Sequence, residues 1–123
     1  MKTLVAAAAV AALALTPAFA DCIYPQAPGK LPDGNTATLK QMLAGMKTVG
    51  AYNQKMNAYL ACIKLEQSTA LANGGTKLTK KQKAEIQAIE IQKHNAAVDQ
   101  LHAVADQFNN QVKIYKAKHA KSQ

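Results

Sequence analysis

The feature that most constrains this chain is a heptad repeat between Leu39 and Ala70. With Leu39 at position a, the a and d positions hold Leu39, Met42, Met46, Val49, Asn53, Met56, Leu60, Ile63, Gln67 and Ala70. Seven of these ten residues are large and apolar, and they are spaced alternately three and four apart. In an α-helix that spacing places them on one stripe. The repeat therefore predicts a long amphipathic helix whose a/d stripe packs against another helix.

A second helical pattern follows a glycine-rich stop at residues 73–76. Its apolar positions are Ile86, Ile89, Ala97, Val98, Leu101, Val104, Ala105, Phe108, Val112 and Tyr115. We expect helices over about 37–71 and 79–118, begun by Thr-x-x-Gln capping boxes at Thr38 and Thr79. Long helices joined by a short loop pack antiparallel. The fold class predicted for residues 37–123 is thus all-α, a long antiparallel helical hairpin that resembles a coiled coil.

Three further features of the helices lead to expectations. His94 falls at an a position of the second helix and, like Asn53 in the first, is interpreted as a polar seam residue that fixes register. Tyr52 and Tyr59 fall at g, on a flank outside the a/d stripe. Two glycines inside the first helix, Gly45 and Gly50, indicate the close approach of another backbone. Because one stripe hides too little apolar surface, we expect a dimer.

The first twenty residues have the pattern of a secretory signal peptide. A positive start at Lys2 precedes an apolar run over 4–15 that is too short to span a bilayer, and an A-x-A site ends at Ala20. Cleavage between Ala20 and Asp21 would leave a periplasmic or secreted chain without a transmembrane segment. A retained membrane anchor is the alternative.

Residues 21–36 cannot form a helix, because they hold three prolines and two glycines. An exported chain with two cysteines favours one disulfide, Cys22–Cys62, over a free pair or a metal site. From Thr36, Cys62 lies about 39 Å up the helix, and Cys22 lies about 43 Å away in polyproline II. An extended segment could thus run along the first helix, stapled by the disulfide, with Tyr24 and Pro25 near Tyr59.

The run Cys-x-x-Pro-x-x-Pro-x-x-Leu-Pro-Asp-Gly-Asn-Thr-Ala-Thr, followed by Met42, Tyr52 and the segment Tyr59-Leu60-Ala61-Cys62, resembles a small class of exported helical proteins of Gram-negative bacteria. These proteins are uncharacterised, and the resemblance covers about residues 21–66. It implies a periplasmic address and carries over no activity, cofactor or functional residue.

Catalytic patterns do not emerge from the sequence. Beyond the signal peptide the only serines are Ser68 and Ser122, and Glu85 and Glu90 are spaced so that they do not share a helix face. We therefore expect no enzyme and no cofactor. Asp99, His102 and Asp106 are candidates for a divalent metal site, although they lie opposite the stripe and are interpreted as solvated.

The distribution of charge indicates a role in surface binding or solubility and gives no sign of catalysis. The net charge is +8, every basic residue apart from histidine is lysine, and the lack of arginine argues against nucleic acid. The lysines cluster at the hairpin tip and at the tail: Lys77, Lys80, Lys81 and Lys83, then Lys113, Lys116, Lys118 and Lys121. These clusters either solubilise the rod or bind an anionic surface.

Three hypotheses for function follow. The first is a non-catalytic exported hairpin that binds a protein partner, or itself, through helix faces. The second is a cationic binder of anionic envelope components, lipid or cell-wall polymer. The third is a periplasmic metal-binding protein. The partner's identity, the oligomeric state and the biological process stay open at this point.

Overall fold

The computed structural model describes residues 21–121. The described residues form two long helices and contain no strand: α1 spans Leu39–Gly74, a 3-10 turn η1 spans Gly75–Lys77, and α2 spans Lys80–Ala120. The prediction of an all-α chain is confirmed. The predicted ranges differ from these bounds by at most three residues at any helix end. The predicted signal peptide lies outside the described residues.

Both helices begin where the sequence places a capping box. The Thr38 hydroxyl accepts from the Gln41 backbone N–H while the Gln41 side chain accepts from the Thr38 N–H, at 3.2 and 2.8 Å. Thr79 and Gln82 repeat this arrangement at the start of α2. Each box satisfies N–H groups that lack an intrahelical partner. At the end of α1, Gly75 has φ +47°, a backbone conformation that favours glycine, and this residue turns the chain towards α2.

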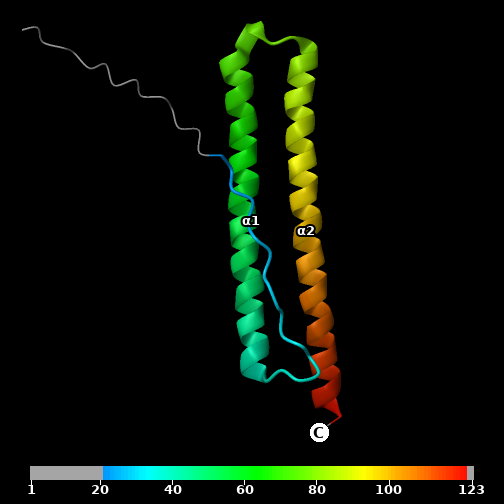
Figure 1. Cartoon of the computed structure of the whole chain (residues 1–123). Coiled ribbons are helices and arrows are strands. Elements are labelled where there is room, and N and C mark those ends of the chain that lie inside the picture. The colour runs from blue at the N-terminus through cyan, green and yellow to red at the C-terminus, as the bar shows by residue number, and fades with distance from the viewer. Residues whose placement is uncertain (1–20, 122–123) are drawn as a thin grey trace, which may run out of the picture.

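Figure 1 shows α1 and α2 side by side along most of their length, with the chain turning back between them. Two contacts fix which residues lie level with each other. Near the base Gly45 lies against Phe108, and nearer the tip Lys93 pairs with Glu66 at 3.2 Å. The molecule is therefore a long, thin rod whose base holds the start of α1 and the end of α2.

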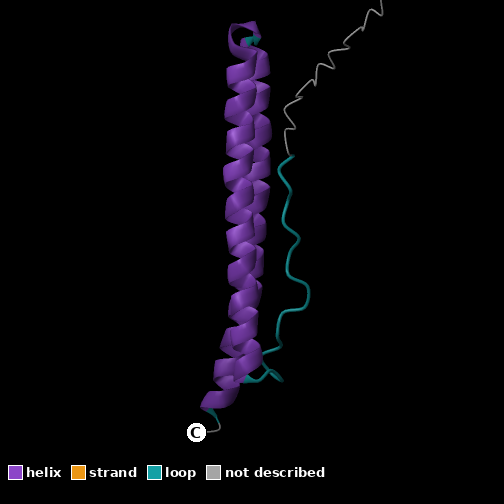
Figure 2. Cartoon of the chain, turned by 90° about the vertical axis from the view of Figure 1, so that its left-hand side faces the viewer, coloured by secondary structure: helices purple, strands orange, loops and turns teal. Residues whose placement is uncertain are grey.

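The N-terminal segment, residues 21–38, forms a third layer. It runs without helix along one side of the helix pair, as Figures 1 and 2 show from two directions. The expected contact of Tyr24 with Tyr59 is confirmed, with ring centroids 5.0 Å apart in an edge-to-face arrangement. Further along the segment, Pro32 packs closely against Gly45. A Cβ atom on Gly45 would lie only 2.6 Å from the Cγ atom of Pro32.

The buried stripe of α1 is rotated around the helix from the predicted one: it follows the d and g positions and not the a and d positions. Its α1 residues occupy d and g: Met42, Gly45, Val49, Tyr52, Met56, Tyr59 and Ile63. The expectation for the a positions is wrong at Leu39 and Met46, which are 59% and 55% exposed, and Tyr52, expected on an outer flank, is only 3% exposed. The reason is the N-terminal segment, which covers the g side and moves the centre of burial towards it. From α2, Ala97, Val104 and Phe108 complete the core.

Candidate binding surface

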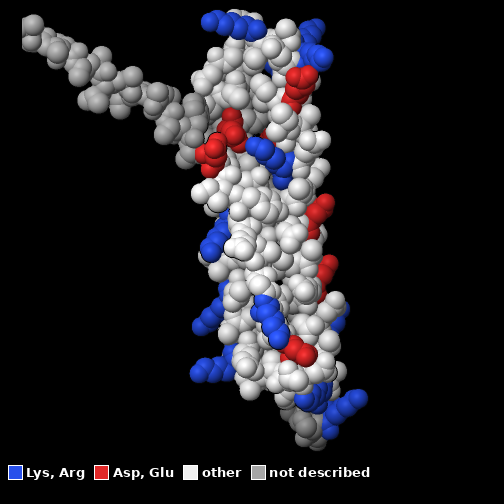
Figure 3. All heavy atoms as spheres, viewed as in Figure 1, with Lys and Arg blue, Asp and Glu red and all other residues white. Residues whose placement is uncertain are grey.

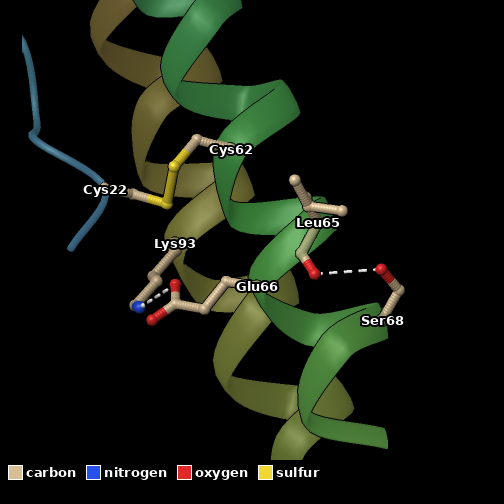
Figure 4. The surroundings of a disulfide bond; sticks show 6 residues. All are labelled: Cys22, Cys62, Leu65, Glu66, Ser68 and Lys93. Carbon is tan, nitrogen blue, oxygen red and sulfur yellow. Dashed lines mark hydrogen bonds and ion pairs between the residues drawn. A yellow bond between two sulfur atoms is a disulfide. The ribbon is translucent and has the colours of Figure 1, made fainter. Parts of the chain in front are cut away.

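A disulfide joins the N-terminal segment to α1. The predicted Cys22–Cys62 bond is present, with the two Cα atoms 5.7 Å apart across 40 residues of sequence. Figure 4 shows Cys22 reaching Cys62 from the extended segment, close to the pair formed by Glu66 and Lys93. The bond holds the start of the segment two-thirds of the way up α1.

The other end of the segment is fastened to α2. A turn at Asp33, whose carbonyl accepts from the Thr36 and Ala37 N–H groups, brings Gly34 against the last turns of α2. The Gly34 N–H donates to the Gln111 side chain at 2.8 Å. A Cβ on Gly34 would lie 2.2 Å from the Gln111 carbonyl oxygen, so this contact requires glycine. Lys118 also donates to the Asn35 carbonyl. The segment therefore ties both helices together at the base.

Tyr52 of α1 is buried beneath this third layer, next to Tyr24. Its hydroxyl has no hydrogen-bond partner among the described residues. Burial raises the pKa of this hydroxyl above 10.0, and the neighbouring Tyr24 raises the same pKa further. The ring thus packs beneath the segment.

The opposite side of α1 is not covered by the segment. Leu60 lies about 160° around the helix from Cys62, at about 100° per residue. Residues at the same a and e positions continue this stripe: Leu39, Leu43, Met46, Gly50, Asn53, Asn57, Leu60 and Lys64. Leu43 is 47% exposed, and Leu39 and Met46 are more exposed still. A stripe at heptad spacing therefore remains open along α1, and its large apolar members are Leu39, Leu43, Met46 and the half-buried Leu60.

α2 contributes the second half of this surface. A shallow hollow between the helices is lined by Leu60, Ala61, Lys64, Gln67, Glu90, Ile91, His94 and Asn95. Helical spacing extends the α2 side of the hollow towards the base through Val98, Leu101, Ala105, Asn109, Val112 and Lys116. We call these two stripes together the open face. Val98, Leu101 and Val112 are half-buried there, so their remaining surface adds to that of Leu43 and Met46.

No family model, curated protein or solved structure matches the chain. The open face is therefore interpreted from its own chemistry.

Charge is distributed unevenly along the rod. On the face in Figure 3, lysines gather at the two ends and along the lower part of α1, and most acidic side chains lie between them. In the helices, all residues over 39–56 and 107–121 that carry a full charge are lysines. The tip cluster lies in η1 and the first turn of α2, where no acidic residue balances the helix dipole. The tail cluster lies at the favourable end of α2, and one member, Lys118, has the structural role described above.

The other candidate residues are not brought together. Asp99, His102 and Asp106 are exposed, and no group of metal-binding side chains is found in residues 21–121. His94, interpreted as a seam residue, is exposed at the rim of the hollow, because the seam passes through Ala97 and Val104 instead. Neither described helix has an apolar run long enough to cross a membrane.

The open face does not stand out as one surface in the amino-acid sequence. Leu43 is exposed and Val98 and Val112 are half-buried, whereas Tyr52 and Tyr59, which were expected outside the a/d stripe, are buried. The signal that could have separated them was the disulfide. Cys62 is a c residue, so a segment anchored there covers the neighbouring g side and leaves the a/e side uncovered.

Proposed function

We propose that this chain is an exported, non-catalytic protein whose coiled-coil-like antiparallel hairpin binds a protein, another copy included, through the open face. The observation that carries the proposal is the second heptad stripe of α1. An exposed apolar stripe at heptad spacing is the surface by which helices pack onto other helices. Here it stands on a rod whose other side is already closed.

Several features support a binding role over a catalytic one. The open face is long and shallow, whereas small-molecule sites are concave and largely enclosed. Apolar side chains alternate along it with polar ones, which include Asn53 and Asn57 near the centre of its α1 stripe. The disulfide supports the exported address, since such bonds persist in oxidising compartments.

A second candidate is a cationic binder of anionic envelope polymers or lipid. It is favoured by the four tip lysines, which stand at the positive end of the α2 dipole without a neutralising acid. Binding of this kind depends on charge alone and weakens as salt is added. Helix-face binding depends on buried apolar area and survives salt.

One capture experiment separates the two candidates. The chain is immobilised and exposed to envelope extract at about 0.1 M and about 0.5 M salt, where screening lengths differ about twofold. We compare the wild type with Met46→Glu, on the open face, and with Ile23→Glu, an 86% exposed residue of the N-terminal segment. Our proposal predicts a bound protein that resists salt, is lost with Met46→Glu and is kept with Ile23→Glu. Capture that salt abolishes and Met46→Glu leaves intact would instead support the cationic binder.

A further inference from the structure

On its α2 side the open face carries opposite charges at its two ends, and on its α1 side Lys64 lines the same hollow as Glu90. Lys116 stands at the base end of the α2 stripe, and Glu90 lines the hollow at the other end. Between them the stripe residues of α2 are apolar or uncharged: Ile91, His94, Val98, Leu101, Ala105, Asn109 and Val112. A partner that matches the α2 stripe needs an acidic group at one end and a basic group at the other.

Asn53 lies midway between these two charges. The contacts of Gly45 with Phe108 and of Glu66 with Lys93 set the levels of the two helices. With that register, Lys116 lies level with about residue 40 of α1, and Glu90 with about residue 66. Each is about 13 residues, or roughly 20 Å, from Asn53 along the rod. A two-fold axis through Asn53 would therefore place Lys116 of one copy opposite Glu90 of another, twice.

The same two-fold axis would bring an apolar side chain of one copy to the hollow of the other. Leu43 lies about ten residues from Asn53 on the base side, and the hollow around Leu60 and Lys64 lies at a similar distance on the tip side. A second copy turned about Asn53 would bring its exposed Leu43 to this hollow. The two Asn53 amides would meet at the axis, where each can donate and accept a hydrogen bond. A polar residue at such a position fixes the register of paired helices.

The area is sufficient for a stable pair. The stripe from Leu39 to Lys64 is about 38 Å long, and two packed helices present a face about 20 Å wide. A copy would thus bury about 750 Å², against about 800 Å² per partner in specific interfaces.

We propose that the open face binds a second copy of this chain, as an antiparallel dimer whose two-fold axis passes by Asn53. The proposal rests on the proposed function and names its partner. A parallel dimer is disfavoured, because it would place the base lysines of one copy beside those of the other. The antiparallel pair forms a four-helix assembly with the N-terminal segments on its two outer sides.

Charge reversal tests both the partner and its direction. We compare sedimentation of the wild type, Lys116→Glu, Glu90→Lys and the double variant that carries both changes. Each single variant should raise the dimer Kd about tenfold, since one substitution turns two symmetry-related attractions into repulsions. The double variant should return to within about twofold of the wild type. Thermal unfolding of each variant at low concentration is the control for folding.

Other outcomes overturn the dimer. A wild type that is monomeric at about 500 µM contradicts it, and so does a double variant that dimerises no better than the single variants. Failure here is distinguishable from failure of the proposed function: a monomeric wild type that still captures an envelope protein through Met46 contradicts the dimer alone.

Discussion

Two glycines of α1 differ in what surrounds them. A Cβ on Gly45 would lie 2.6 Å from Pro32 and 2.9 Å from Phe108, whereas a Cβ on Gly50 would meet nothing within 4 Å. The close approach predicted for both positions is confirmed at Gly45 and is wrong at Gly50. Composition alone could not separate them, because a glycine at a heptad position gives no direction to the neighbour that needs the space.

Alanine at these positions should change stability in opposite directions. Gly50→Ala should raise the free energy of unfolding by about 0.5–1 kcal/mol, because alanine costs less backbone entropy in a helix. Gly45→Ala has the same entropic advantage, but its Cβ forces Pro32 or Phe108 out of place. This variant should therefore lower the free energy of unfolding by about 1–2 kcal/mol. Denaturant unfolding at low micromolar concentration measures both. Equal effects would show that the segment is not seated against Gly45.

Tyr52 leads to a prediction about alkaline pH. Because burial raises the pKa of its hydroxyl, the unfolded chain ionises first as the pH rises past 10.0. The folded state therefore loses stability above that pH and keeps it in full below. Tyr52→Phe should unfold no more easily than the wild type at pH 8, since the lost hydroxyl has no described partner. Above pH 10 its melting temperature should fall less. Parallel falls in the two chains would contradict the burial of this group.

At the scale of elements, the N-terminal segment determines where the core lies. Its path could be predicted from lengths, because only a nearly straight chain from Thr36 reaches Cys62. The attachment of Gly34 and Asn35 to α2 could not be predicted, because it depends on two hydrogen bonds. One runs from the Gly34 N–H to the Gln111 side chain, and the other from the Lys118 side chain to the Asn35 carbonyl. Nothing in the spacing of those polar residues distinguishes them from other surface groups on α2.

Removing the disulfide should loosen this element while both helices remain. Closing a loop of 40 residues accounts for about 4 kcal/mol in the chain-entropy view. The Cys22→Ser/Cys62→Ser double variant should keep its helical circular dichroism at 20 °C and melt at least 10 °C lower. Limited proteolysis should cut it between residues 22 and 35, where the wild type resists. An unchanged melting temperature and cleavage pattern would mean that the segment is held by its other contacts.

At the scale of the whole molecule, the helical rod could be predicted and its open side could not. Heptad spacing and the two capping boxes give the helices and their ends. Which stripe of α1 stays exposed depends on the side that the N-terminal segment takes, and that is a property of three elements together. The a positions fit a core in the isolated pattern, yet Leu39 and Met46 are at the surface because the segment draws burial towards Tyr52 and Tyr59.

Light scattering of the chain at about 500 µM and about 0.5 M salt tests most directly the central claim that two copies of the chain pair through the open face. A dimer held mainly by apolar contacts should give twice the protomer mass under these conditions. Leu43→Glu should give the protomer mass, and Ile23→Glu, which makes the same charge change on the opposite side, should stay dimeric. A wild type of protomer mass, or a dimer that Leu43→Glu leaves intact, would contradict pairing through the open face.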